Sequence, residues 1–136
     1  MTNKTRTAQA GIAFVTWQLT RRDWEVMPAP DTSKRSILLL IRKESLAKEV
    51  LIQPRSFINH DAVRLGQDII GPDSFLFDWM VITTHVRSDS PTCFMLDRQD
   101  ALEIMKQDPG GPFFWIDPSR YRLSCFQNRW DDIGRE

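Results

Sequence analysis

The sequence predicts an α+β fold in which a mixed central β-sheet is flanked by helices. Apolar residues recur at helical spacing over residues 5–22. Segments of strand character follow at 24–28, 37–41 and 50–53, and a second helix is expected to begin after Asp97. An order of helix, strands, further strands, helix and strand places helices against the faces of a sheet. We also expect an extra C-terminal strand and a helical tail.

The length and composition predict a single domain over residues 1–136. Of the 136 residues, 41% are hydrophobic, with five Trp and eight Phe among them. A chain of this size can bury one substantial core. Residues 1–9 lack an apolar signal core and no stretch is long enough to cross a membrane, so we expect a cytoplasmic protein without membrane contact.

The first helix is expected to carry two apolar stripes. The stripe that should face the sheet has spacings of four, three and four residues, and it consists of Ala8, Ile12, Val15 and Leu19. At about 100° per residue, a second stripe lies on the opposite side of the helix. A neighbouring Phe and Trp make an unfavourable solvent face, so another helix, the C-terminal segment or a partner chain should cover it. We expect a homodimer through this second stripe, which consists of Ala10, Ala13, Phe14 and Trp17.

Three strands are predicted after this helix. Residues 24–28 alternate like a short strand, and the prolines that follow cannot extend a ladder. The aliphatic run 37–41 is typical of a central strand covered on both faces. Residues 50–53 form the third strand, which Pro54 is expected to end. The second and third strands should form a hairpin.

The second half of the chain begins with a polar segment, residues 56–74, that predicts a loop or a short helix. Residues 75–86 and 92–96 return to strand character. Asp97 is a favourable N-cap for the next helix. A last strand is expected at 113–116, followed by a helical turn from Pro118 and a tail that buries aromatic residues, namely Tyr121, Phe126 and Trp130.

The charge balance and the cysteines restrict the possible functions. Eighteen basic and eighteen acidic side chains cancel, so a broad positive field is absent and any nucleic-acid site must be a local patch. Cys93 and Cys125 have no CxxC spacing and no Cys/His cluster that would indicate zinc. We interpret both as buried reduced thiols.

In their order and spacing, these segments resemble the restriction-endonuclease-like superfamily, the PD-(D/E)XK nucleases, and particularly its small stand-alone bacterial members. The resemblance covers most of the chain and rests on residues 11–15, 19–26, 31–33, 51–56, 75–84 and 115–130. It implies an αβββαβ core. The predicted C-terminal strand and helical tail are additions to that core.

The resemblance also implies a degenerate active site. In active relatives the first helix contributes a Glu, the second strand an Asp, and the third strand a Glu or Gln followed by a Lys. The matching positions in this chain are Ile12, Ser36, Gln53 and Arg55. A Mg²⁺ site needs one or two carboxylates, and an arginine with a pKa above ~12 cannot carry protons as a lysine does. We therefore expect no catalysis and no cofactor.

Two alternatives stay open at this point. Asp31 and Glu25 are acids that would serve as migrated Mg²⁺ ligands if endonuclease activity survives. Separately, a group of basic residues near the same strands is expected to contact a phosphate backbone, unless it is only a solvated hairpin rim. That group consists of Lys34, Arg35, Arg42, Lys43 and Arg55.

The sequence thus favours a catalytically inactive nuclease-fold protein that works as a nucleic-acid-binding or protein-binding regulatory module. The first alternative is an active divalent-metal-dependent endonuclease. The second is an interaction protein unrelated to nucleases. The lone histidines, His60 and His85, are interpreted as exposed residues without a catalytic partner.

Overall fold

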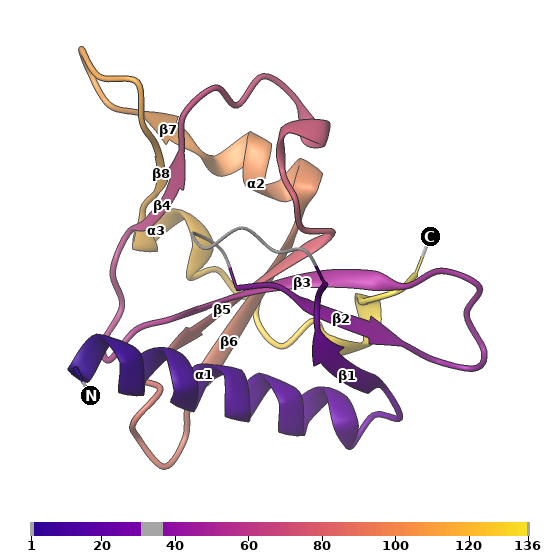
Figure 1. The fold of residues 1–136 in the computed structure, drawn as a ribbon. Helices are drawn as coiled ribbons and strands as arrows, with labels where there is room; N and C mark the ends of the chain where they lie inside the picture. Colours follow the sequence, from indigo (N-terminus) through magenta and orange to yellow (C-terminus); the bar gives the residue numbers. More distant parts are fainter. Residues whose placement is uncertain (1, 31–36, 136) are drawn as a thin grey trace.

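The computed structural model describes residues 2–30 and 37–135 of the chain, and it shows a mixed α+β fold (Figure 1). The expected fold class is confirmed at this level. In chain order the elements are α1 (Asn3–Thr20), β1 (Glu25–Pro28), β2 (Leu39–Arg42), β3 (Val50–Ser56), β4 (Val63–Gly66), η1 (Pro72–Ser74), β5 (Trp79–Thr84), β6 (Thr92–Asp97), α2 (Arg98–Ile104), β7 (Lys106–Gln107), β8 (Phe114–Ile116), α3 (Pro118–Tyr121) and η2 (Trp130–Asp132).

The strands form two sheets. A five-stranded sheet has the order β1-β2-β3-β5-β6, and a three-stranded sheet has the order β4-β8-β7. In the larger sheet β3 and β5 run parallel, whereas the other neighbours are antiparallel. The predicted β2–β3 hairpin is present, with Leu39 opposite Ile52.

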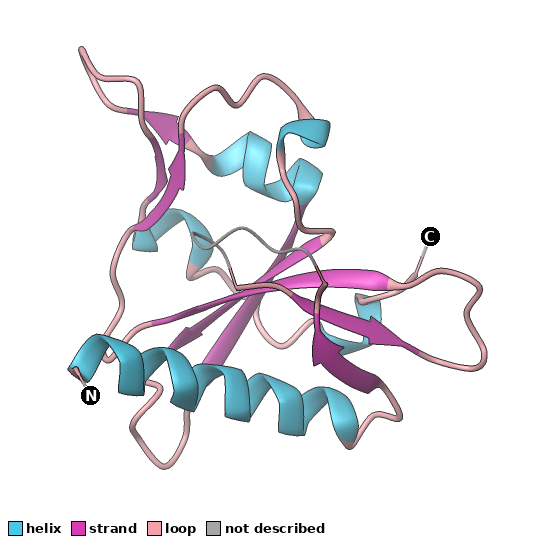
Figure 2. Ribbon diagram, in the orientation of Figure 1, coloured by secondary structure: helices cyan, strands magenta, loops and turns pink. Residues whose placement is uncertain are grey.

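Helix α1 covers one face of the larger sheet, and α2, α3 and the smaller sheet lie on the other side (Figures 1 and 2). Each face has its own hydrophobic core. Beneath α1, Val15 and Leu19 pack with Ile41, Ile52 and other strand residues. The opposite core combines strand residues with the smaller sheet and α3, and includes Met80, Ile82, Leu96, Val63, Ile116 and Tyr121. The central strand β5 is buried along its whole length because it contributes to both cores.

The sheet-facing side of α1 differs slightly from the prediction. The helix begins after Thr2, whose side-chain oxygen accepts a hydrogen bond from the Thr5 amide at 3.1 Å. Its fully buried positions are Thr7, Gly11, Val15 and Leu19. The predicted positions Ala8 and Ile12 are only half-buried, because they lie beside this line and border a cleft.

Strand β3 is longer than predicted, since it continues through Pro54 to Ser56. The Leu51 carbonyl accepts a hydrogen bond from the Asp78 amide at 2.8 Å, so odd-numbered residues of β3 direct their backbone toward β5. Pro54 therefore directs its nitrogen, which has no hydrogen, toward the other side, where β2 begins only at Leu39. The proline removes no hydrogen bond from the β3–β5 ladder.

The connection between β3 and β5 contains β4 and the short helix η1. The sequence predicted a loop or a short helix for residues 56–74 and missed β4. An αβββαβ core would place an α-helix between these two strands, whereas α2 follows β6. The strand β7 was also missed, and Ile37, predicted inside a central strand, is exposed.

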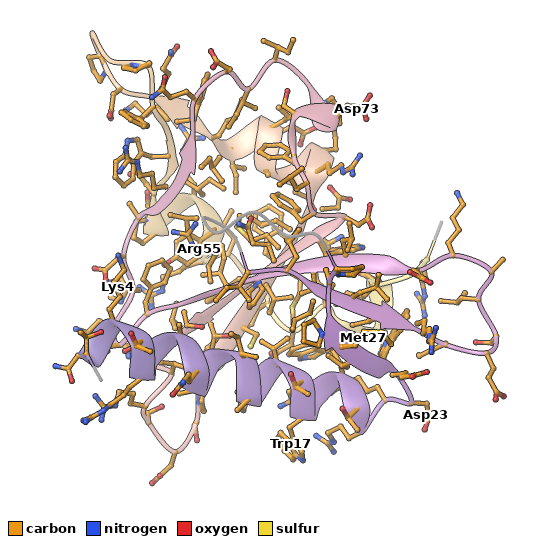
Figure 3. The ribbon with its side chains drawn as sticks, in the orientation of Figure 1. Lys4, Trp17, Asp23, Met27, Arg55 and Asp73 are labelled. Carbon is orange, nitrogen blue, oxygen red and sulfur yellow. The ribbon has the colours of Figure 1, made fainter. Side chains whose placement is uncertain are left out.

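The second stripe of α1 is only partly open to solvent: Ala13 and Trp17 are exposed, whereas Ala10 and Phe14 are half-buried and Phe14 packs against the core beneath α1. Trp17 is 55% exposed, and Figure 3 shows it pointing away from the sheet. Its ring lies 6.0 Å from that of Phe14, and the Arg21 guanidinium lies over it at 5.0 Å. Neither another helix nor the C-terminal segment covers Trp17 among the described residues, although such a cover was one of the expected possibilities.

Two further observations concern the cysteines and the helices. Cys93 is buried as predicted, and burial raises the pKa of its thiol to about 11. Cys125 is exposed, so the prediction for it was wrong: it lies in an irregular segment between α3 and η2. Among the described helices, none combines the length and apolar character needed to cross a membrane.

Candidate functional site

Two of the segments that the resemblance implies meet at one cleft, which lies between α1 and the end of β3. Ile12 borders it from the helix, and Gln53 and Arg55 border it from the strand. Ile37, which precedes β2, also lies on its wall. The cleft has a volume of about 510 Å³. Ser36, the fourth implied position, lies outside the described residues.

A glycine brings the two walls of this cleft together. Gly11 is buried where α1 crosses β3. A Cβ atom at this position would overlap the Ser56 hydroxyl and lie 2.5 Å from the Ser56 Cβ atom. No residue with a side chain fits this crossing unless the helix or the strand moves. The glycine thus sets how close the N-terminal half of α1 lies to the end of β3.

Gln53 and Arg55 lie at an edge of β3 that has no neighbouring strand among the described residues. The β2–β3 pairing reaches only as far as Ile52. On its other side β3 continues beside β5, with Gln53 opposite Met80 and Arg55 opposite Ile82. Along β3, Ile52 packs into the core beneath α1 and Leu51 packs against the opposite core, so Gln53 and Arg55 direct their side chains to the face opposite α1. A second cleft lies on that face, and both residues border it as well as the first. The first cleft and the second cleft therefore share Gln53 and Arg55.

Arg55 is the cationic centre of the two clefts. It is half-buried, and its Nη1 donates a hydrogen bond to the Arg64 carbonyl oxygen at 3.1 Å. Burial lowers the pKa of its guanidinium from the usual value, because the charged form loses hydration. Lys4 borders the first cleft from α1, and Figure 3 shows both at the same end of the molecule.

The described lining of the first cleft does not fit a Mg²⁺ site. It contains one carboxylate, Asp61, which is exposed, and two basic side chains, Lys4 and Arg55. Mg²⁺ is bound in proteins by one or two carboxylates in a near-ideal octahedron, and adjacent cations oppose its binding. Within residues 2–30 and 37–135, no group of three or more His, Cys, Asp or Glu residues is placed to hold a metal ion.

Glu25, the alternative ligand, does not lie at this cleft. Glu25 is opposite Arg42 in the β1–β2 pairing, and Leu39, at the other end of β2, is opposite Ile52 of β3. The three residues from Leu39 to Arg42 span roughly 10 Å along β2. A hydrogen bond from Arg42 at 2.9 Å lowers the pKa of Glu25. Glu25 instead borders a different cleft near Asp23, at the other end of α1 (Figure 3). Asp31 lies outside the described residues.

The basic residues predicted to act as one group are separated. Arg42 and Lys43 lie at the β2 end remote from Arg55, where Arg42 pairs with Glu25 and the Lys43 Nζ lies 4.4 Å from the Trp24 ring centroid. The expectation of a single patch is therefore wrong for these residues, because the hairpin carries them away from the end of β3. Lys34 and Arg35 lie outside the described residues.

Three residues near the clefts were missed by the sequence interpretation. Lys4 precedes the apolar repeat of α1, and Asp61 and Arg64 belong to the segment predicted as a loop. Tyr121 fixes this segment, because its hydroxyl donates to the Asp61 carbonyl oxygen at 2.8 Å across 60 residues of chain. No local sequence pattern reveals such a distant contact.

His60 and His85 are closer together than the sequence suggested. Their ring centroids are 5.9 Å apart, and the His85 amide donates to the Asn59 carbonyl oxygen at 3.0 Å. His60 is exposed as expected, and His85 is half-buried. Neither residue borders the two clefts.

Comparison of the chain with protein-family models, with curated proteins and with solved structures finds no match.

Proposed function

We propose that this protein is a catalytically inactive member of the restriction-endonuclease-like superfamily and that it binds nucleic acid through the clefts at the end of β3. One observation carries the proposal. Ile12, Gln53 and Arg55, which match three of the superfamily's active-site positions, border one cleft. The order of a helix and three antiparallel strands, followed by a parallel strand, also supports it.

The chemistry of the first cleft favours binding of an anion over metal-assisted cleavage. Apolar Ile12 replaces the helix acid, and the basic residues that border the cleft are Lys4 of α1 and Arg55 of β3. A half-buried arginine that donates one hydrogen bond to a backbone oxygen has further N–H groups for a phosphate. The chain has zero net charge, so binding must depend on these few groups.

Replacing Arg55 by alanine is expected to weaken binding of a labelled DNA or RNA strand by about tenfold, because one charge-assisted phosphate contact is lost. Fluorescence anisotropy at low salt measures this change. Arg87→Ala removes an exposed arginine that borders neither cleft, and it should bind as the wild type does. An equal loss of affinity in both variants, or no loss in either, contradicts the assignment of nucleic-acid binding to the clefts.

The absence of cleavage needs its own assay. The protein is incubated with linear and branched DNA and with RNA in the presence of Mg²⁺ or Mn²⁺, and the products are separated by electrophoresis. We expect intact substrates. Cleavage that disappears in Gln53→Ala would establish an active endonuclease and refute the inactive assignment.

We further propose that the protein forms a homodimer through the second stripe of α1. The observation behind this is the exposed Trp17, whose ring lies 6.0 Å from that of the half-buried Phe14. Light scattering is expected to show a dimer for the wild type and a monomer for Trp17→Glu, because a carboxylate cannot be buried in an apolar interface without a partner. Leu123→Glu, at another exposed apolar residue, should stay dimeric. A wild-type monomer rules out the dimer.

A further inference from the structure

The second cleft combines positive charge with aromatic surface. Its volume is about 560 Å³, within the range of ~300–1,000 Å³ that is usual for small-ligand sites. Its described lining includes no Asp or Glu. The lining combines polar side chains with aromatic rings, and the residues that matter here are Gln53, Arg55, Arg64, Ser74, Phe77 and Phe113.

Arg64 lies on an aromatic surface. Its guanidinium carbon is 3.8 Å from the Phe113 ring centroid and 5.8 Å from that of Trp115. Trp115 is itself fixed, since its indole Nε1 donates to Asp108 at 2.8 Å. A guanidinium stacked on a ring keeps a second planar face, and the Arg64 side chain is exposed, so that face is open to a ligand.

The backbone of β4 turns sharply at this point. The β4–β8 pairing shifts register between Arg64 and Gly66, so Leu65 is an extra residue in the ladder. Gly66 has a φ of +104°, which residues with a side chain rarely adopt, and a Cβ there would meet no atom within 4 Å. The bulge thus sets the direction of Arg64 and leaves open space beside it.

Arg55 provides the second positive group. It is held by its hydrogen bond to the Arg64 carbonyl oxygen, so the two arginines are coupled through the backbone of β4. Neither arginine forms an ion pair with an acid in the described part of the chain. A planar cation on an aromatic ring next to a half-buried cation matches a ligand with a planar π-system and an anionic group.

We propose that the second cleft binds one unpaired nucleotide of a single-stranded nucleic acid. The base stacks on the Arg64 guanidinium, with Phe113 on its far side, and the adjoining phosphate accepts hydrogen bonds from Arg55. This assignment rests on the proposed nucleic-acid binding, because Arg55 borders both clefts. A base within a duplex is covered by its stacked neighbours, so the cleft selects single strands.

The test compares three labelled DNAs by fluorescence anisotropy: a short single strand, an abasic strand of equal length, and a duplex of the same sequence. The single strand is expected to bind about tenfold more tightly than the abasic strand, because only its bases stack. Arg64→Lys keeps the charge and removes the planar group, so it should bind both strands with similar affinity. Phe113→Leu should also reduce the preference for the base-bearing strand over the abasic strand. Arg87→Ala is the matched control and should keep this preference.

The outcomes separate this inference from the proposed function. Equal binding of the base-bearing and abasic strands by the wild type overturns the inference and leaves phosphate binding intact. The inference is also wrong if Arg64→Lys keeps the full preference for bases. If none of the three DNAs binds and an RNA strand of the same sequence does not bind either, both proposals fall together. Unfolding temperatures of the variants, measured by circular dichroism, establish that each is folded at the temperature of the assay.

Discussion

Replacing Gly11 by alanine is expected to lower the free energy of unfolding by about 3 kcal/mol, the upper part of the range for overpacked cores. Alanine favours helices over glycine by ~1 kcal/mol, so helix propensity alone predicts the opposite sign. The steric conflict should prevail, because the new Cβ would overlap the Ser56 hydroxyl at a crossing of two regular elements. Urea denaturation followed by circular dichroism measures the change.

Two further variants make this result specific. Gly71→Ala is the matched control, since a Cβ there meets nothing within 4 Å and its φ of −171° is open to any residue; it should stay within about 0.5 kcal/mol of the wild type. Combining Gly11→Ala with Ser56→Gly removes the overlapping side chain and should recover most of the loss. A Gly11→Ala protein as stable as the wild type would mean that α1 does not cross β3 at this point.

Replacing Arg129 by alanine is expected to be the second strongly destabilising change, by about 3 kcal/mol, as when one partner of a largely buried ion pair is removed. Arg129 donates to the Asp100 carboxylate at 2.7 Å and to the Met95 carbonyl oxygen at 3.2 Å. It also donates to Asp132 at 3.0 Å and lies over the Trp79 ring. It thus connects the C-terminal segment to β5, β6 and α2.

The loss of unfolding free energy in Arg129→Ala should depend on pH. Burial raises the pKa of Asp97, the N-cap of α2, and the charge of Arg129 opposes that rise. Without Arg129 the carboxyl group of Asp97 should be protonated more readily in the folded state. A carboxyl group whose pKa is higher in the folded than in the unfolded state destabilises the fold at pH values above its folded-state pKa. This destabilisation disappears as the pH falls toward the pKa of the unfolded state. The difference between variant and wild type should therefore be smaller near pH 4 than at pH 7.

Denaturation at both pH values measures the Arg129 effect, and the exposed Arg120 provides the control. Arg120→Ala should change stability by less than about 0.5 kcal/mol at either pH. If Arg129→Ala is equally mild, the C-terminal segment contributes little to the stability of the sheet. A loss of stability that is constant with pH would exclude the Asp97 carboxyl group as the origin of the pH dependence.

The elements that sequence predicted well are those with local signals. The apolar repeat identified α1, and Asp97 accepts a hydrogen bond from the Asp100 amide at 2.8 Å, as its position before α2 indicated. The alternating and aliphatic runs identified the strands of the larger sheet, with ends that differ by up to four residues: β5 starts at Trp79 where residue 75 was predicted, and β3 ends at Ser56 where residue 53 was predicted. These features arise within a few neighbouring residues, so a single sequence contains them.

The features that were missed depend on distant partners. Strand β4 has only four residues within a mainly polar segment, and it becomes a strand because Val63 and Arg64 pair with Ile116 and Trp115. The continuation of β3 through Pro54 depends on β5, which lies more than twenty residues ahead. For the site, the resemblance indicated Ile12, Gln53 and Arg55, which do border one cleft. Lys4 of the first cleft and Arg64 of the second could not be assigned from the sequence, because their neighbours are set by tertiary contacts.

The pairing of β4 with β8 also has a consequence for the order of synthesis. Residues 63–66 leave the ribosome well before residues 114–116, yet their only described strand partner is β8. Contacts over such a separation form late, after the loop-closure entropy between them has been overcome. The five strands of the larger sheet are complete by Asp97, so α1 and β3, which border the first cleft, can be in place while the wall of the second is still being made. On the two proposals made above, a nascent chain would thus acquire phosphate binding before selection of bases.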